Sequence, residues 1–475
     1  MRKLKRFQKI VGISFAPALD SLAGATPRPT MNSPDQFPLL TALRERRSRR
    51  FGRGMKIPGG SLAFESRHAS RAITEEEEAA LVFAACGITG HALADLCYTK
   101  DGGGNIMAGL VGRTIASGDG LQTVSLIVTN DEATYLIRKP RELPAGEITE
   151  LIALGKRGEF LEFYRRCRVK IKDCRASISP DPLFNINANR WSAHATGTTY
   201  FLPINDLTFM YVNGLLEVLN EHTGTFILDE RNHFLPAGIG KFARSRGGHL
   251  EDDPAKSCIA TVRQVEQFVT EFVTAEQGMM LQNLGLMAEA LGLGGYPNLA
   301  NHEFAWFQAL GFRMQEMPAS RYVGAGWLPS LMMNMLRRNP AVPYPVGLER
   351  DGEILLKPFC PPYFASMAEA VRAVVAIKFG NDGMFRAEGH GSAWMNHDAT
   401  TKPVEPVSET AIKATIAHCE YLWRRYGRFP VHMPPYRTVL GFQSSHVDVE
   451  FYDKFYKPGA VSETVRKDFE SQSGA

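Results

Sequence analysis

The sequence lacks several patterns that mark common classes of protein. Its seven cysteines are scattered, odd in number and free of CxxC spacing, which argues against a disulfide scaffold or a zinc ribbon and favours reduced thiols in a cytoplasmic protein. No GxxxxGK[ST] phosphate loop is present, and neither GGGN at Gly102 nor GIG at Gly238 completes a GxGxxG motif after a clear strand. We therefore predict neither a phosphate loop nor a dinucleotide-binding Rossmann site.

An excess of charge of one sign and a long apolar run are also missing. The chain has 54 Lys and Arg against 50 Asp and Glu, a net charge of +4, which is too balanced to predict a nucleic-acid partner. The most apolar stretch begins at Met279 and is far shorter than the roughly 20 residues that span a bilayer, so no membrane partner is predicted. The N-terminus has a basic start, but Ser14, Pro17 and Asp20 interrupt its apolar part, and residues 1–36 are predicted to be a disordered leader.

The best-patterned stretch is a helix predicted from Val262 to the glycines at 292–295. Steps of three and four residues visit one face that is apolar except at Glu276 and Asn283. Because the other faces are also apolar beyond Met279, the helix is expected inside a core. Glu276 and Asn283 then need partners. A core arginine for Glu276 and neighbouring backbone for Asn283 would be one solution, and a functional role would be the other.

Further elements follow along the chain. A short helix after Phe37 is expected to point three leucines inward, a second helix should begin at an N-cap at Thr74, and residues 121–130 alternate as a strand with a hairpin partner at 133–139. Residues 37–380 are predicted to form one domain, with an insertion at about 141–257, and residues 381–475 a C-terminal extension. The extension carries so many aromatic residues between 428 and 458 that we expect it to wrap the core or a partner subunit.

Two clusters carry chemistry. Arg46, Arg47, Ser48, Arg49 and Arg50 combine guanidinium forks and a hydroxyl near a helix end, which suits a phosphate, although a solvated basic face gives the same pattern. In the tail, polar residues alternate, and on a strand they would share a face. They could chelate a divalent metal or simply line the wet face of an edge strand, and we predict no metal; the three residues are His446, Asp448 and Glu450.

Several of these stretches, in order, resemble the nitroreductase-like flavoenzyme superfamily, and most of all its azoline dehydrogenases, which act on thiazoline and oxazoline rings in peptides. RRSRR at Arg46 resembles the RRSxR phosphate motif, and RTIASGDGLQTVSLIVTN at Arg113 is similar to RTxPSAGALxPxxxYxxV. EQGMMLQNLGLMAEALGLGG, from Glu276, matches EAGHxxQNLxLxAxALGLG best. The resemblance implies an α+β fold, with an antiparallel sheet packed around a buried central helix, and FMN at the seam of a homodimer.

The resemblance also implies site residues, which are carried over only where the motifs match. Two residues fall on the grip for the FMN phosphate, a third lies between them, and a late lysine is a loose fourth match. The remaining matches fall on the loop under the isoalloxazine, on a ring-side glutamine and on the backbone at the flavin edge. The phosphate ligands are Arg46 and Ser48, Arg47 lies between them, and Lys357 is the loose match. The loop residues are Ser117 and Gly118, the ring-side glutamine is Gln122, and the backbone residues at the flavin edge are Gly294 and Gly295.

The implied activity is hydride transfer through flavin N5, with NAD(P)H as donor for a reductase or oxygen as acceptor for a dehydrogenase, on a small molecule or peptide. The chain departs from the family pattern at Ala116, Gly120 and Met279, where a proline, an asparagine and a histidine are common. The substrate and any catalytic residue stay open. A flavin-cleaving enzyme, a flavin-binding or interaction protein without turnover, and a metal-dependent enzyme are the alternatives.

Overall fold

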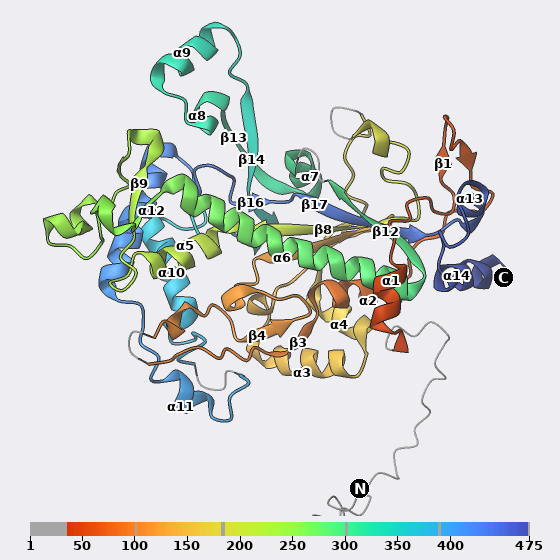
Figure 1. The fold of residues 1–475 in the computed structure, drawn as a ribbon, viewed down its shortest axis with the longest axis horizontal. Coiled ribbons are helices and arrows are strands. Elements are labelled where there is room, and N and C mark those ends of the chain that lie inside the picture. The colour runs from red at the N-terminus through yellow and green to blue at the C-terminus, as the bar shows by residue number, and fades with distance from the viewer. Residues whose placement is uncertain (1–35, 100–101, 182–185, 300–302, 388–390, 474–475) are drawn as a thin grey trace, which may run out of the picture.

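The computed structural model describes residues 36–99, 102–181, 186–299, 303–387 and 391–473, and Figure 1 shows their arrangement. The predicted leader, except Gln36, lies outside these residues. Among the described residues, no helix is long and apolar enough to cross a bilayer. All seven cysteines are free thiols, as predicted.

One antiparallel sheet organises the molecule. Its strands follow the order β12, β17, β8, β5, β6, β7, with β16 paired to the edge of β8. Each neighbouring pair is antiparallel, which confirms the α+β class and the predicted hairpin β5–β6. The strands are β5 (Val124–Thr129), β6 (Thr134–Ile137), β7 (Arg168–Lys172), β8 (Thr199–Asp206), β12 (Leu293–Leu299), β16 (Tyr436–Arg437) and β17 (Leu440–His446).

Helices cover both faces of this sheet, so strand β5 is buried along its whole length and not on alternate residues only. Figure 1 shows the long helix α6 (Val262–Leu291) crossing in front of the sheet. The other helices are α1 (Leu39–Glu45), α2 (Glu75–Cys86), α3 (Ala145–Lys156), α4 (Phe160–Cys167), α5 (Leu207–Val218), α7 (Glu303–Leu310), α8 (Ala319–Val323), α9 (Trp327–Met335), α10 (Met367–Phe379), α11 (His397–Thr401), α12 (Glu409–Tyr426), α13 (Val449–Phe455) and α14 (Glu463–Ser473).

Smaller sheets lie around the main one. Strands β1 and β2 form one antiparallel pair, and β3 and β4 form another. Strand β9 is flanked by β10 and β11, and β13–β14–β15 form a three-stranded antiparallel sheet. Their bounds are β1 (Lys56–Ile57), β2 (Phe64–Glu65), β3 (Ile88–His91), β4 (Val111–Arg113), β9 (Phe226–Asp229), β10 (Leu235–Pro236), β11 (Ile259–Thr261), β13 (Phe312–Pro318), β14 (Ala341–Arg350) and β15 (Glu353–Leu356).

Helix α6 exists as predicted, but it is not buried all round. Thr261 and Gln264 form a capping box at its start, and Gly292, with φ of 78°, ends it. The buried face keeps Val269 and Glu276 of the predicted one, but it also turns toward Val273, Met280 and Leu284, each one position beyond a residue of the predicted face. On the opposite face Phe268 is 62% exposed. A helix that is apolar on all faces gives no indication of which side the protein covers. Within one chain, only one side of α6 is covered.

Helix α1 also differs from its prediction. The helix forms, but its leucines face solvent, with Leu39 64% and Leu40 69% exposed, and Leu43 is exposed as well. Only Ala42 is buried. The leucine spacing gave the correct element and the wrong side, because α1 lies on the rim of the molecule against α6 (Figure 1).

The segment expected to be an insertion is part of the core. Strand β8 lies inside the main sheet between β5 and β17, and helix α5 packs in the largest hydrophobic cluster. The C-terminal extension is also built in, since β17 pairs with β8 and β12. Most of its aromatic residues between 428 and 458 are buried as predicted, among them Phe429, Tyr436, Phe442 and Phe451, but Tyr456 is 47% exposed.

Candidate functional site

The arginine motif meets the two-glycine strand at one end of the sheet. After α1 the chain runs extended, and Arg49 forms an antiparallel bridge with Gly295 of β12. The approach is so close that a Cβ atom on Gly294 would lie 2.7 Å from the carbonyl oxygen of Arg49. A side chain at Gly294 would therefore push the motif off the strand, so this contact requires glycine.

Arg49 is committed to structure. Its Nη1 lies 2.5 Å from Oε2 of Glu289 on α6, and both side chains are 2% exposed. Its Nε donates to the carbonyl of Ala460 at 3.0 Å, and its Nη2 donates to that of Glu45 at 3.1 Å. One guanidinium thus joins α1, α6 and the C-terminal segment, and each of its three nitrogens is engaged within the fold. No local pattern predicts this pair, because its members are 240 positions apart in the sequence.

The motif lines a pocket of about 520 Å³, within the usual range of roughly 300–1,000 Å³ for ligand sites. Arg47 and Ser48 are exposed on its wall. Among the residues that the structure describes, no hydrogen bond or ion pair engages either side chain. Facing them are aromatic residues from the loop before β8 and from the C-terminal extension, namely Trp191, Phe451, Tyr452 and Tyr456.

Arg50 forms the inner edge of this pocket. Its guanidinium lies 4.6 Å from the ring centre of Tyr296 and 5.2 Å from that of Trp191, and its Nη2 donates to Oδ1 of Asn189 at 2.5 Å. Its Nε is buried without a hydrogen-bond partner. A guanidinium held on aromatic faces keeps its charge in a partly desolvated place, so Arg50 adds a positive charge to the lining of the pocket.

Arg46 does not line the pocket. It is half-buried along α6, where its Cδ lies 3.3 Å from the position of a Cβ on Gly285. No described residue forms a hydrogen bond or an ion pair with its side chain. The three predicted phosphate ligands at 46–48 therefore all keep free donors, with Arg47 and Ser48 on the pocket wall and Arg46 beside α6.

The loop at Ser117 lies elsewhere along α6, around Glu276. Glu276 is buried, as predicted, but its partners are not an arginine. It accepts hydrogen bonds from the hydroxyl of Ser117, from the backbone amide of Thr123 at 2.9 Å and from the hydroxyl of Thr123 at 2.5 Å. Asn283 is only half-buried, and it donates to the carbonyls of Ala84 at 3.0 Å and Thr114 at 3.1 Å, the backbone partners expected of it.

Gly118 and Gln122 are also engaged within the chain. A Cβ on Gly118 would lie 2.3 Å from the ring of Phe272. Gln122 is 5% exposed, its amide donates to the carbonyl of Val111, and its backbone amide donates to Oγ of Ser117 at 2.8 Å. The structure thus joins the arginine motif to Gly294 and Gly295 but leaves the Ser117 loop at Glu276. This residue lies 13 positions before the Glu289 that pairs with Arg49, roughly 20 Å along α6 at about 1.5 Å per residue.

Lys357 lies apart from both groups. It follows β15, in a different sheet from β12, and its side chain is exposed. Its Nζ lies 5.2 Å from the ring centre of Phe364, and it does not line the pocket of the arginine motif. Lys357, the loose match to a phosphate ligand, therefore lies outside the cluster formed by the other phosphate residues of its own chain.

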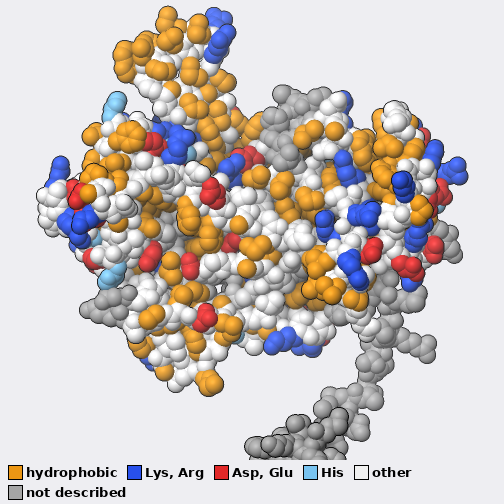
Figure 2. Space-filling model, viewed as in Figure 1, with side chains coloured by type: hydrophobic (Ala, Val, Ile, Leu, Met, Phe, Trp, Pro, Cys, Tyr) orange, Lys and Arg blue, Asp and Glu red, His pale blue; other side chains and the backbone are white. Residues whose placement is uncertain are grey.

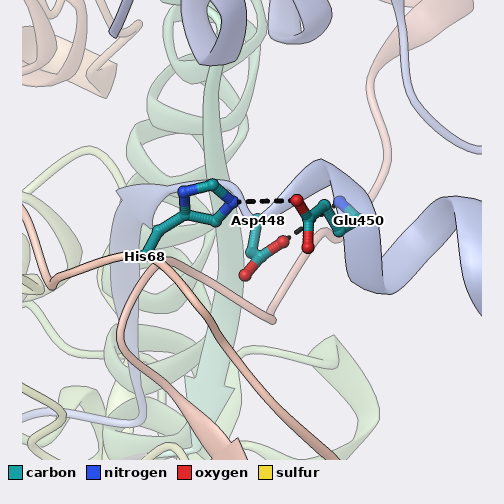
Figure 3. Close-up of side chains that lie close together, drawn as sticks. All are labelled: His68, Asp448 and Glu450. Atoms are coloured by element: carbon teal, nitrogen blue, oxygen red, sulfur yellow. Dashed lines mark hydrogen bonds and ion pairs between the residues drawn. The ribbon is translucent and has the colours of Figure 1, made fainter. Parts of the chain in front are cut away.

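The three alternating polar residues of the tail do not share a face. Strand β17 ends at His446, and Asp448 is the N-cap of α13. Figure 3 shows Asp448 and Glu450 together with His68 instead, whose Nε2 lies 3.2 Å from Oε1 of Glu450. The His68 Nδ1 lies 3.4 Å from Nη2 of Arg53, an atom that can only donate. Nδ1 then accepts from Arg53, and Nε2 donates to Glu450, so the ring links these two side chains.

His446 belongs to a separate buried cluster. Its Nδ1 lies 3.2 Å from Asp468 on α14, and its Nε2 lies 3.5 Å from Glu77 on α2. Burial by itself would lower the pKa of His446, but hydrogen bonds to Asp468 and Glu77 outweigh it and raise the pKa to about 9. The imidazolium therefore clamps the last helix to the start of α2.

Comparisons with known proteins add little to this geometry. No protein-family model matches the chain, and no curated protein sequence does. Among solved structures, the chain is similar to a protein of Ralstonia eutropha JMP134 whose assignment as a nitroreductase is itself provisional, with 12% sequence identity and a TM-score of 0.28 over 60% of this chain and 79% of that one. At this TM-score the similarity assigns neither a family nor a function.

Proposed function

We propose that the chain is an FMN-dependent oxidoreductase whose flavin phosphate binds at residues 46–48. The observation that carries the proposal is the meeting of this motif with Gly294 and Gly295 through the Arg49–Gly295 bridge, beside a pocket of about 520 Å³. Motif and strand are distant in sequence, and each is independently the type of segment that approaches a phosphorylated flavin. When bound, the flavin supplies hydride transfer through N5.

The donors of the motif suit a phosphate. Arg46, Arg47 and Ser48 offer two guanidinium forks and a hydroxyl, none of them engaged by another described side chain. Charge-assisted hydrogen bonds from arginine to phosphate oxygens are the strong ones. Arg49 is unsuitable, because all three of its contacting nitrogens are committed within the fold.

The second half of the predicted site, at Ser117, Gly118 and Gln122, is turned toward α6 within its own chain. We propose that it meets the phosphate half of a second copy in a homodimer. The exposed apolar side of α6, with Phe268 62% and Met279 37% exposed, and the exposed leucines of α1 give such an interface its core. A groove of about 470 Å³ between α1, α2 and α6 lies on the same side, with Asn283 on its wall.

The visible spectrum of the purified protein tests this function. A yellow protein that anaerobic NADH or NADPH bleaches is a reductase, and one that only a substrate bleaches is a dehydrogenase. A yellow protein that no donor reduces is a flavin binder without turnover. A colourless protein that does not take up added FMN contradicts the proposal. Sedimentation velocity on the same sample, with a monomer as the only species, would contradict the two-copy site but not flavin binding.

A further inference from the structure

A hydrophobic arm projects from the body of the molecule. Strands β13 and β14 form an antiparallel ladder of seven pairs, and helices α8 and α9 follow at its end. Figure 1 shows this arm standing away from the main sheet, and Figure 2 shows its outer part covered with apolar side chains and carrying a basic patch. The body of the protein therefore does not cover the arm.

Helix α9 buries none of its residues. Its exposed apolar residues, together with Leu336 at its C-cap, recur at i, i+1, i+4, i+5, i+8 and i+9, which gathers them on one broad face. The exposed fractions are Trp327 80%, Leu328 50%, Leu331 48%, Met332 53%, Met335 76% and Leu336 60%. Side chains that large do not remain in water without a partner when they form a continuous patch.

The outer part of the arm, beyond the acidic Glu316 of β13 and Glu349 of β14, carries charge of one sign. Between Met317 and Leu348 there are three arginines and no aspartate or glutamate. Arg321 is tied to the body, since its Nε donates to the carbonyl of Tyr426 at 3.3 Å. Arg337 and Arg338 directly follow the apolar face and are exposed. No described residue forms a hydrogen bond or an ion pair with either of these two side chains.

We propose that the arm docks on an anionic phospholipid surface. The apolar face of α9 would enter the boundary between headgroups and acyl chains, with Trp327 at the level where indole rings are favoured, and Arg337 and Arg338 would contact lipid phosphates. A helix of nine residues is roughly 13 Å long at about 1.5 Å per residue, too short to cross the bilayer. Contact with one leaflet is therefore the mode that fits, and it is independent of the flavin proposal.

Co-sedimentation of the full chain with vesicles tests the arm. We expect binding to phosphatidylcholine vesicles that contain phosphatidylglycerol and much weaker binding to phosphatidylcholine alone. Neutralising both arginines, as R337Q with R338Q, should weaken binding to the anionic vesicles by about 25-fold, at roughly fivefold for each basic residue. L331Q with M335Q should abolish binding to both kinds of vesicle.

The matched control is L93Q, which removes a leucine that is 77% exposed outside the arm and should leave vesicle binding unchanged. Circular dichroism of all variants checks that they fold. Wild-type protein that stays in the supernatant with anionic vesicles would overturn the proposal. If L331Q with M335Q instead lowers the sedimenting mass of the protein, the arm is a contact between two copies of the chain and not a lipid anchor.

Discussion

Arg49 and Glu289 form an ion pair in which 2.5 Å separates Nη1 from Oε2, with both side chains 2% exposed. The pair fastens the extended arginine segment to the C-terminal end of α6. It also explains why only some arginines of the motif are available to a ligand. Arg49 holds the segment in place, and its neighbours Arg47 and Ser48 are left free on the pocket wall.

Breaking this pair should destabilise the protein strongly. R49M leaves the Glu289 carboxylate buried without a cation, which typically costs about 3–5 kcal/mol. Urea unfolding should show this loss of the free energy of unfolding. The double variant R49M with E289L should cost less than R49M alone, because it removes both charges. Additive losses in the two single variants and the double variant would show that the two side chains do not interact.

The hydrogen bonds that Glu276 accepts from Ser117 and Thr123 lead to a second prediction. E276A leaves the Thr123 amide and two hydroxyls without their acceptor, which should cost roughly 3 kcal/mol. E271A changes an exposed glutamate on the same helix and should alter stability by less than about 0.5 kcal/mol. Equal unfolding midpoints for the two variants would mean that the Glu276 face of α6 is not buried.

The His446 cluster predicts a dependence of stability on pH. The folded pKa of about 9 exceeds the usual unfolded value of 6.5, so the unfolded state releases its proton first as pH rises. The contribution of His446 is therefore complete below about pH 6.5 and is lost as pH rises through 9, a change on the order of 3 kcal/mol. Denaturant unfolding between pH 6 and pH 9 measures it.

H446Q should remove this part of the pH dependence and destabilise the protein at pH 6. H233N serves as the control, because His233 is exposed and has a φ of 56°, which asparagine tolerates. A wild-type protein whose stability, relative to H446Q, stays constant from pH 6 to pH 9 would contradict the clamp.

Local patterns in the sequence were enough to predict several elements. The N-cap of α2 at Thr74 is formed as predicted, and Glu77 completes a capping box with it, because this chemistry lies within one turn. Glu276 could be placed in the interior because it interrupts an apolar face. The sheet class and the hairpin β5–β6 also followed from alternation and turn residues.

The features that could not be predicted depend on contacts between residues that are far apart in the sequence. The leucines of α1 show a helix but not which side the body occupies, and the spacing of α6 fits two faces equally well. The alternation of His446 and Asp448 ends where β17 gives way to the N-cap of α13. Strand β8 was placed in an insertion, since pairing with β17 joins segments that no local pattern connects.

The phosphate site at residues 46–48 is the central claim, and fluorescence titration of the apoprotein with FMN tests it most directly. A charge-assisted hydrogen bond contributes about 1.5–3 kcal/mol, and about 1.4 kcal/mol is one decade of affinity. R46A should therefore weaken FMN by roughly one to two decades, R47A similarly, and S48A by less because its hydroxyl is neutral. K357A should leave the affinity unchanged, since Lys357 lies outside the cluster.

Riboflavin lacks the phosphate, so its weaker binding should be nearly the same in wild type and in R46A, R47A and S48A. This comparison separates loss of a phosphate ligand from loss of folding. The account predicts that FMN affinity falls in the three variants while riboflavin affinity does not. Equal FMN affinity in wild type, R46A and R47A would contradict it and leave the arginine motif as a solvated basic face.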